Sequence, residues 1–276
     1  MTKNYRKALA LGLCVCWLLT AGGCIIATAR YERAVQLSAP LQEGSLFAAQ
    51  THNGSITVNG ADVGECNLTA TIVARAVTEE EAQRLAEQTQ VSLEPSGNKL
   101  TAKIEKPYTR TNQSVSVSLD VTVPNHSDLQ ITTHNGAVEI SNINGQIEGL
   151  THNGKVSTTQ VSGAANLQTH NGSVRCEEIS GDVQLKTHNG SVKAYYHEAA
   201  PPVCNVSIVS HNGGIEFVAP PGFSAQVEAS THNGSVRTDL PIAVTGKVDK
   251  TKLTGTIGAG QGKLYLETHN GSIRIR

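Results

Sequence analysis

The chain has 276 residues, of which 38% are hydrophobic and only 4% aromatic, and its 22 basic and 23 acidic side chains give a net charge of −1. Without residues 1–23, which contain Lys3, Arg6, Lys7 and no acidic residue, the balance is 19 against 23, or −4. This balance predicts no basic patch for nucleic acid or for anionic lipid headgroups. The single tryptophan, Trp17, lies in that first segment, so few aromatic side chains are left to stack on sugars.

Residues 1–23 have the pattern of a lipoprotein signal peptide, with three basic residues before an uncharged apolar stretch at 8–21. The following Ala-Gly-Gly-Cys24 resembles a bacterial lipobox, although Ala21 stands where the pattern usually has Leu. The resemblance implies that Cys24 is lipidated and tethers the chain to a membrane, and Ile25 in place of Asp implies the outer membrane. Cleavage after Ala29, giving a secreted or periplasmic protein, and an uncleaved anchor remain alternatives. Residues 24–44 are expected to be a linker.

Residues 45–128 are expected to hold a first coil, which contains His52, and a small α+β cap. Residues 68–74 alternate in polarity as a strand does, and Thr78 with Glu81 forms a capping box that predicts a helix over 79–90. Further strands are expected near 91–93, 100–105 and 115–123. A cap is needed because a terminal repeat cannot bury both of its faces.

Residues 129–276 are built around the tripeptide His-Asn-Gly, which occurs eight times in the chain. Four copies, from His134 to His188, follow one another at intervals of 18 residues. Polarity alternates with period 2 on both sides of the motif, which predicts two short strands per repeat, and the constant phase favours stacked coils over antiparallel hairpins. The predicted fold is all-β: a parallel β-solenoid, wound as a right-handed β-helix of about 18-residue coils, with looser excursions at 195–204 and 239–263.

The Asn-Gly pair of each motif predicts a turn with positive φ between the two strands. A second corner is expected at Gly145, Gly163 and Gly181, which are also 18 residues apart. The residues expected to form the first turn are Asn135, Gly136, Asn153, Gly154, Asn171, Gly172, Asn189 and Gly190.

Two segments carry a family resemblance. Residues 115–135 contain an alternating strand, a Val-Pro pair and a second strand that runs into Thr-His-Asn-Gly, and residues 258–273 read Gly-Ala-Gly-Gln-Gly-Lys-Leu-Tyr-Leu-Glu-Thr-His-Asn-Gly-Ser-Ile. Over about 45–276 the chain resembles the bacterial candidate-adhesin family of β-strand-repeat envelope lipoproteins, a domain of unknown function. The resemblance implies the fold; the adhesin name is itself an inference from architecture and specifies no partner.

Strand parity turns the Thr of each motif inward and the His outward. Equivalent residues of stacked coils lie about 4.8 Å apart, so the asparagines are expected to pair amide to amide and the threonines to bond backbone at the corner. This structural role explains Thr, Asn and Gly without a ligand and leaves the outward imidazoles unexplained. The expected histidine ladder is His134, His152, His170, His188, His211 and His232.

Two functions suit such a ladder. Adjacent rings offer two ligands to an ion such as Zn²⁺, but a one-dimensional row offers four with difficulty, so no specific metal site is assigned. Alternatively the ladder responds to pH, because protonated neighbours repel one another.

No catalytic residues are predicted, because Gly-x-Ser-x-Gly, His-Glu-x-x-His and phosphate-cradling loops are absent from the sequence. Cys66, Cys176 and Cys204 are expected to be small core residues, or one disulfide and one buried thiol. The chain ends at 272–276 directly after the last motif, so an open edge and end-to-end association through this C-terminal strand are expected.

The sequence therefore predicts a non-enzymatic lipoprotein of the cell envelope, without cofactor, in an adhesin-like or scaffolding role. Its partners are expected to be the membrane, through Cys24, and a protein or surface of unknown identity, but not nucleic acid. The alternative is a periplasmic metal-binding or pH-responsive protein that uses stacked histidines.

Overall fold

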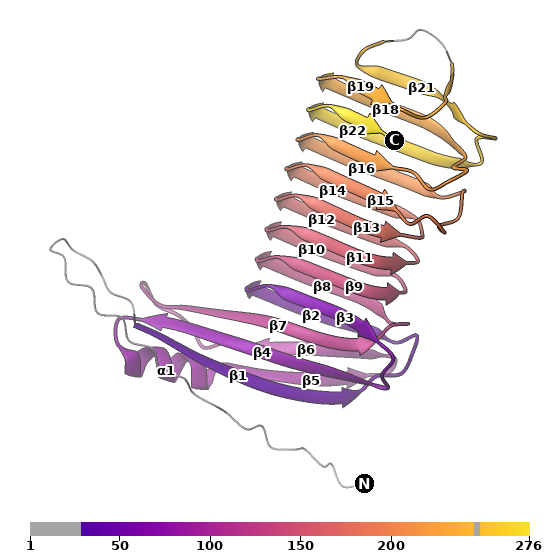
Figure 1. Ribbon diagram of the computed structural model, residues 1–276. Helices are drawn as coiled ribbons and strands as arrows, with labels where there is room; N and C mark the ends of the chain where they lie inside the picture. The colour runs from indigo at the N-terminus through magenta and orange to yellow at the C-terminus, as the bar shows by residue number, and fades with distance from the viewer. Residues whose placement is uncertain (1–28, 246–248) are drawn as a thin grey trace, which may run out of the picture.

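The computed structural model describes residues 29–245 and 249–276, and the expected signal peptide and Cys24 lie outside these ranges. Within them the chain is all-β apart from one short helix. The strands form two mixed sheets of 11 and 12 strands that face each other along the length of the molecule (Figure 1). We call the 12-stranded one the histidine sheet, because its repeat strands end in His-Asn, and the 11-stranded one the second sheet.

The coils of the repeat each contribute one strand to each sheet, and in the central coils every neighbour is parallel. Ile147 pairs with Leu129 on one side and with Ala165 on the other, so paired residues lie 18 positions apart, which excludes antiparallel hairpins here. The strands of the histidine sheet in this region are β8 (Asp128–Asn135), β10 (Ile147–Asn153), β12 (Ala165–Asn171) and β14 (Val183–Asn189). Those of the second sheet are β9 (Val138–Asn144), β11 (Val156–Ser162), β13 (Val174–Ile179) and β15 (Val192–Tyr196).

The core lies between the two sheets and is made of rows of like residues. Val138, Val156, Val174 and Val192 are fully buried and occupy the same register position in four successive strands. Because successive side chains of a strand point to opposite faces, one apolar residue in two is enough to fill this layer. The outer faces remain polar, which explains how a chain with few aromatic residues builds a long core.

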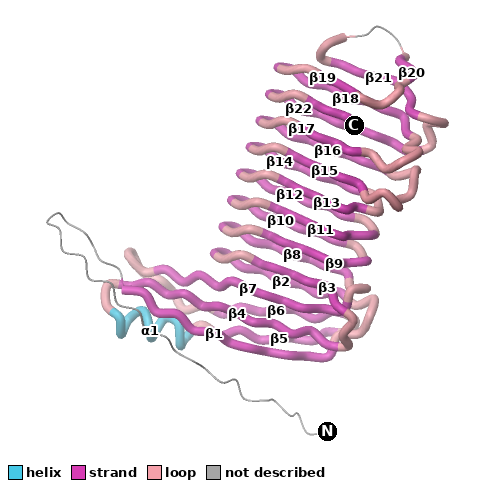
Figure 2. Tube along the Cα trace, viewed as in Figure 1, coloured by secondary structure: helices cyan, strands magenta, loops and turns pink. Residues whose placement is uncertain are grey.

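The N-terminal cap continues both sheets, and its strands in the second sheet are longer than those of the coils (Figure 2). In the second sheet β1 (Ala29–Pro40), β4 (Glu65–Ala76) and β7 (Ser114–Pro124) are antiparallel, and β7 joins the parallel strand β3 (Ile56–Ala61) of the first coil. In the histidine sheet β2 (Leu46–Asn53) is followed outward by β6 (Lys99–Glu105) and β5 (Gln90–Ser96).

The segment expected to be a linker differs from that expectation, because residues 29–40 form β1. Alternate residues of β1 pack against the cap, and the whole strand pairs with β4. The predicted helix is present as α1 (Glu79–Gln88), and the Thr78 hydroxyl accepts a hydrogen bond from the backbone N–H of Glu81. This helix packs on β1 and β4, and no described helix is long and apolar enough to cross a lipid bilayer.

At the other end, the order of strands in space departs from the order in the chain. The last coil, β22 (Gly262–Asn270) and β23 (Ile273–Ile275), lies between the coil of β16 (Asn205–Asn212) and β17 (Ile215–Val218) and the coil of β18 (Ala225–Asn233) and β19 (Val236–Thr238). The segment of chain between β19 and β22 forms β20 (Ala243–Val244) and β21 (Lys252–Ile257). Strand β21 pairs antiparallel with β18, and β20 pairs antiparallel with β21.

The expected open edge at residues 272–276 is therefore wrong. Strand β23 pairs with β17 on one side and with β19 on the other, and Ile273 and Ile275 are buried. The strand at the end of the second sheet is β19, which has three residues. The expectation failed because it assumed that the last coil in the sequence is also the last in the stack.

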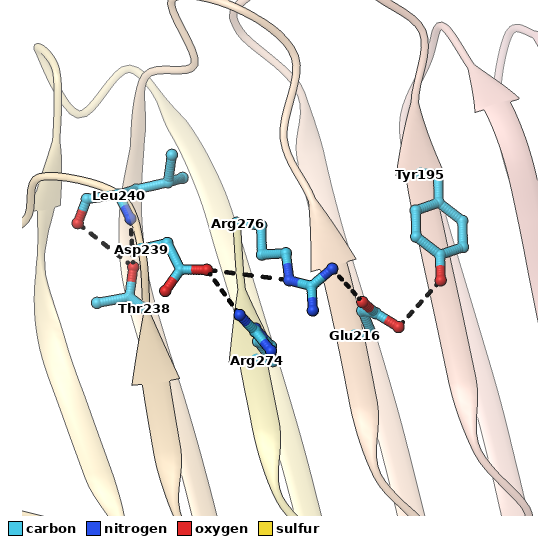
Figure 3. A network of polar contacts seen from close by, with 7 residues as sticks. All are labelled: Tyr195, Glu216, Thr238, Asp239, Leu240, Arg274 and Arg276. Carbon is cyan, nitrogen blue, oxygen red and sulfur yellow. Dashed lines mark hydrogen bonds and ion pairs between the residues drawn. The ribbon is translucent and has the colours of Figure 1, made fainter.

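Side chains on the outer face of the second sheet tie the C-terminus to its neighbours (Figure 3). The Arg276 guanidinium lies 3.1 Å from the Glu216 carboxylate and 3.9 Å from that of Asp239, and Arg274 lies 3.1 Å from Asp239. The Tyr195 hydroxyl donates to Glu216 at 3.0 Å, and burial together with this contact raises the pKa of Tyr195. The polar network thus spans β15, β17, β23 and the residue after β19.

Candidate functional site

The corner after each His-Asn pair depends on close contact between backbones. A Cβ atom built on Gly154 would lie 1.9 Å from the carbonyl oxygen of Gly136, and one on Gly172 would lie 2.0 Å from that of Gly154. Neither Gly136, Gly154 nor Gly172 has positive φ, whereas Gly54 does, at 136°. The positive-φ turn expected at every Asn-Gly is therefore wrong for these copies: glycine is required there because coils stack too closely to admit a side chain.

The inward hydroxyl of each motif closes the same corner. Thr151 donates to the carbonyl oxygen of Gly136 at 2.9 Å, and Thr169 donates to that of Gly154 at 2.8 Å. The seven threonines and Ser210 are buried, so an unpaired hydroxyl would be costly. Each hydroxyl bonds a backbone carbonyl of the neighbouring coil or, for Thr51, of Val117 in the cap.

The asparagines form one continuous ladder along this edge. The amide of Asn153 donates to the Oδ1 of Asn135 at 2.7 Å, and the amide of Asn171 donates to that of Asn153 at 2.8 Å. The same bond recurs from Asn53 to Asn233, so all eight motifs are connected side chain to side chain. Asparagine satisfies this arrangement because its side chain carries both a donor and an acceptor.

The imidazoles form a second ladder beside the asparagines. Neighbouring ring centroids are 4.6 to 4.9 Å apart and the planes are within 5° of parallel. All eight rings are exposed, whereas the preceding Thr or Ser is buried, so the parity argument placed both correctly. In space the ladder runs His52, His134, His152, His170, His188, His211, His269, His232.

The expected ladder lacked His52 and His269 and placed His232 next to His211. His52 was separated by the cap segment, and His269 lies between His211 and His232 because the last coil is inserted there. The shared Thr-His-Asn-Gly motif was the signal that these copies belonged to the same row. The order of the last two rings had no signal in the sequence.

His188 has a like ring on each side, with centroids 4.8 Å away for His170 and 4.6 Å away for His211. Loss of contact with water and the nearby His211 and His170 lower the pKa of His188. The rings lie face to face in a single row, and the described residues contain no group of three or more His, Cys, Asp or Glu side chains arranged to hold a metal ion.

The three cysteines of the described region are buried and free, so none is in a disulfide with another. Burial raises the pKa of Cys66 and of Cys176 to about 12, which keeps both as neutral thiols. Of the two alternatives from the sequence, the structure has the small core residue in all three cases.

Three of the hollows in the described part of the chain follow the outer face of the histidine sheet. The largest, of about 950 Å³, runs across the coils over residues such as Gln130, Asn166 and Gln184. A hollow of about 450 Å³ lies along the distal rings, from His170 to His269. The third, the corner groove, has a volume of about 870 Å³ and lies where the cap meets the first coils. Its basic lining residues are Lys99, Lys103, Lys106, His52, His134, His152 and His170.

The corner groove was not anticipated from the net charge. Lys99 and Lys103 lie on β6, which pairs with β2 beside the start of the ladder, and Lys106 directly follows β6. The described lining contains no Asp or Glu. A net charge of −1 for the whole chain thus conceals a local cluster of cations.

Known proteins offer a comparison of fold. No curated protein matches the sequence. Among solved structures, a candidate cell adhesion protein from Clostridium sporogenes is 10% identical, with 87% of this chain and 97% of that chain covered and a TM-score of 0.38. A candidate adhesin from Bacteroides fragilis is 13% identical, covers 88% and 97%, and has a TM-score of 0.41.

A candidate lipid-binding protein from Parabacteroides distasonis is 11% identical, with 88% and 96% covered and a TM-score of 0.31. A family model also matches the chain, from just after β1 onward. It is the Toastrack DUF4097 model, and it matches residues 42–276. The chain therefore belongs to the Toastrack DUF4097 family, a family of unknown function.

Proposed function

We propose that this protein is a non-enzymatic component of the bacterial cell envelope, anchored through a lipid on Cys24, that presents a rigid repetitive surface in an adhesin-like or scaffolding role. The observation that carries the proposal is the continuity of the Thr/Ser, Asn and His rows through all eight motifs. Every coil is bonded to the next at the same corner, which suits a surface that must keep its spacing over a long distance.

The winding of the coils is part of the proposal. We take the stack to be a right-handed β-solenoid of about 18-residue coils, because β8 and β10 are parallel neighbours joined through β9 in the other sheet. Connections between parallel strands of one sheet are right-handed in about 98% of cases.

The envelope location rests on the leader pattern and on Cys24. Expression of the wild type and of Cys24→Ser, followed by fractionation and labelling with radioactive palmitate, tests it. The wild type is expected in the outer-membrane fraction with label, and the variant without label. Equal labelling and equal distribution of the two would exclude a lipid at this position.

The surface role is tested by coating beads with the full chain and measuring how many of the beads isolated cell envelopes retain. Asn166→Arg/Gln184→Arg places two bulky charges on the histidine sheet, and Ser157→Arg/Thr159→Arg places the same charges on the second sheet as a control. Retention is expected to fall in the first variant only. Retention no higher than that of bare beads would contradict the role.

A second candidate function is metal binding, which the exposed, regularly spaced imidazoles favour. Calorimetric titration with Zn²⁺, Cu²⁺ and Ni²⁺ tests it, with His152→Ala/His170→Ala as the comparison. Saturable binding at micromolar concentration that the variant loses would support a metal ladder. Weak, non-saturating uptake by both would leave the scaffold role alone.

A further inference from the structure

The corner groove combines a concave shape with an excess of cations. Its volume of about 870 Å³ is within the range of about 300–1,000 Å³ that small-molecule sites occupy. One wall is formed by β6 of the cap and the residue after it, and the other by the first rings of the histidine ladder. Figure 1 shows the cap strands at the base of the stack, and the groove lies beside β6 where it pairs with β2.

The lysines of the groove differ in their partners. Lys103 lies 3.0 Å from Glu105 and 3.1 Å from Glu94, and these carboxylates raise its pKa. Its positive charge is therefore already balanced by neighbouring negative charges. Lys99 is 3.4 Å from the amide oxygen of Gln130. Neither Lys99 nor Lys106 has a carboxylate within ion-pair distance among the described residues.

Lys106 is the most informative of the three. Its side chain reaches the surface, yet the surrounding protein displaces enough water to lower the pKa of its ammonium group. A cation that has lost hydration without gaining a counter-ion is less stable than one in water, and an incoming anion relieves this cost.

The rest of the lining supplies hydrogen-bond donors. The hydroxyls of Thr101 and Thr132 and the amides of Gln50 and Gln168 line the same groove. Glu94 and Glu105 contact Lys103 but are not among the lining residues, and Glu148 accepts a hydrogen bond from Gln130 and lines the neighbouring hollow. Two unpaired cations among hydroxyl, amide and imidazole donors match an oxyanion with several acceptor oxygens.

We propose that the corner groove is a binding site for a phosphate-bearing ligand, held by Lys99 and Lys106 with the first four imidazoles of the ladder beside it. The site does not depend on the surface role proposed above, since it lies on the cap and the first coils and needs no envelope partner. It also corrects the expectation, drawn from net charge, that no basic patch is present.

Titration calorimetry of the full chain in detergent with inorganic pyrophosphate at pH 7.5 tests the site. The test variant is Lys99→Gln/Lys106→Gln, and the matched control is Lys250→Gln/Lys252→Gln, which removes two charges at the far end of the stack. Wild type and control are expected to bind with similar affinity, and the test variant at least ten-fold more weakly. Equal affinity of all three proteins would overturn the proposal. So would the absence of pyrophosphate binding by any of them, if phosphatidylglycerol also gives no additional binding to the vesicles described next.

The source of the phosphate is resolved with vesicles. Binding to vesicles of phosphatidylcholine alone measures the lipid anchor, and the additional binding with 20% phosphatidylglycerol measures headgroup recognition. A gain that disappears in Lys99→Gln/Lys106→Gln identifies a phospholipid headgroup as the source. Pyrophosphate binding without such a gain identifies a soluble phosphate compound.

Discussion

At the scale of single residues, the motif assigns a separate task to each of its members. The Thr or Ser hydroxyl bonds a backbone carbonyl, the Asn amide bonds the next Asn, and Gly leaves room for the backbone of the adjacent coil. The histidine differs, because its ring is exposed and stacks on the rings of adjacent coils. The motif is therefore mostly structural, and its imidazole remains accessible to molecules in solution.

Gly154→Ala is expected to destabilise the protein because the added Cβ would lie 1.9 Å from the Gly136 carbonyl oxygen. Overpacking of this kind costs about 1–3 kcal/mol or more. Gly64→Ala is the matched control, since nothing lies within 4 Å of its Cβ position and its φ is not positive. Urea denaturation of both variants measures the difference, and equal midpoints would refute the close-contact explanation.

The stacked imidazoles predict that stability falls in acid. The pKa of His188 is lowered in the folded state from an ordinary value of 6.5, so the unfolded chain binds protons at a higher pH than the folded one. The contribution of the neutral His188 ring to the free energy of unfolding is therefore complete above about pH 6.5. It is lost as the pH falls from 6.5 through the lowered pKa. The melting temperature is expected to be lower at pH 5 than at pH 7.5.

His170→Gln/His188→Gln should reduce this pH dependence, and His126→Gln, outside the ladder, is the control for a histidine-to-glutamine change. Thermal melts of the three proteins at both pH values provide the measurement. Coincident melts of the wild type at pH 5 and pH 7.5 would contradict the role of the stack.

At the scale of elements, the parts with local signals were predicted and the parts set by distant contacts were not. The helix beginning at Glu79 and the alternating strands follow from a capping box and from period-2 polarity. Strand β1 was missed because its partner β4 lies about 35 residues later, and because Arg33 interrupts the alternation of Tyr31, Val35 and Leu37 with polar residues. The corner groove was missed because β6 comes to lie beside β2 only through the sheet of the cap.

Deletion of residues 273–276 is expected to destabilise the distal end, because it removes β23 with two buried isoleucines, leaves β19 without its partner strand and leaves β17 paired with β15 alone. Loss of two such side chains alone is expected to cost about 4 kcal/mol or more. Chemical denaturation measures the loss. Arg274→Ala/Arg276→Ala keeps both isoleucines and removes ion pairs whose arginines are exposed, so its effect should be smaller, at about 1 kcal/mol. A similar effect of both changes would show that pairing of β23 is unimportant.

At the scale of the whole molecule, the constant 18-residue offset makes the central coils equivalent. Deletion of residues 147–164, one complete coil, should therefore preserve the register of every ladder and yield a folded, shorter protein. Deletion of residues 147–155, half a coil, should not yield a folded protein. It removes β10 and leaves β11, a strand of the second sheet, at the place in the chain where a strand of the histidine sheet belongs. Circular dichroism and thermal melting distinguish the two, and equal loss of the β signal in both would contradict the equivalence of coils.

The insertion of β22 and β23 between two earlier coils also has a consequence for the time at which the fold closes. A chain emerging during synthesis or export reaches Val236–Thr238 before the residues on which that strand will rest. The distal coil must wait until β23 has been made, while the proximal coils stack as they appear. A chain that stops before β23 would therefore leave β19 without its partner strand, and this unfolded end would be open to proteases.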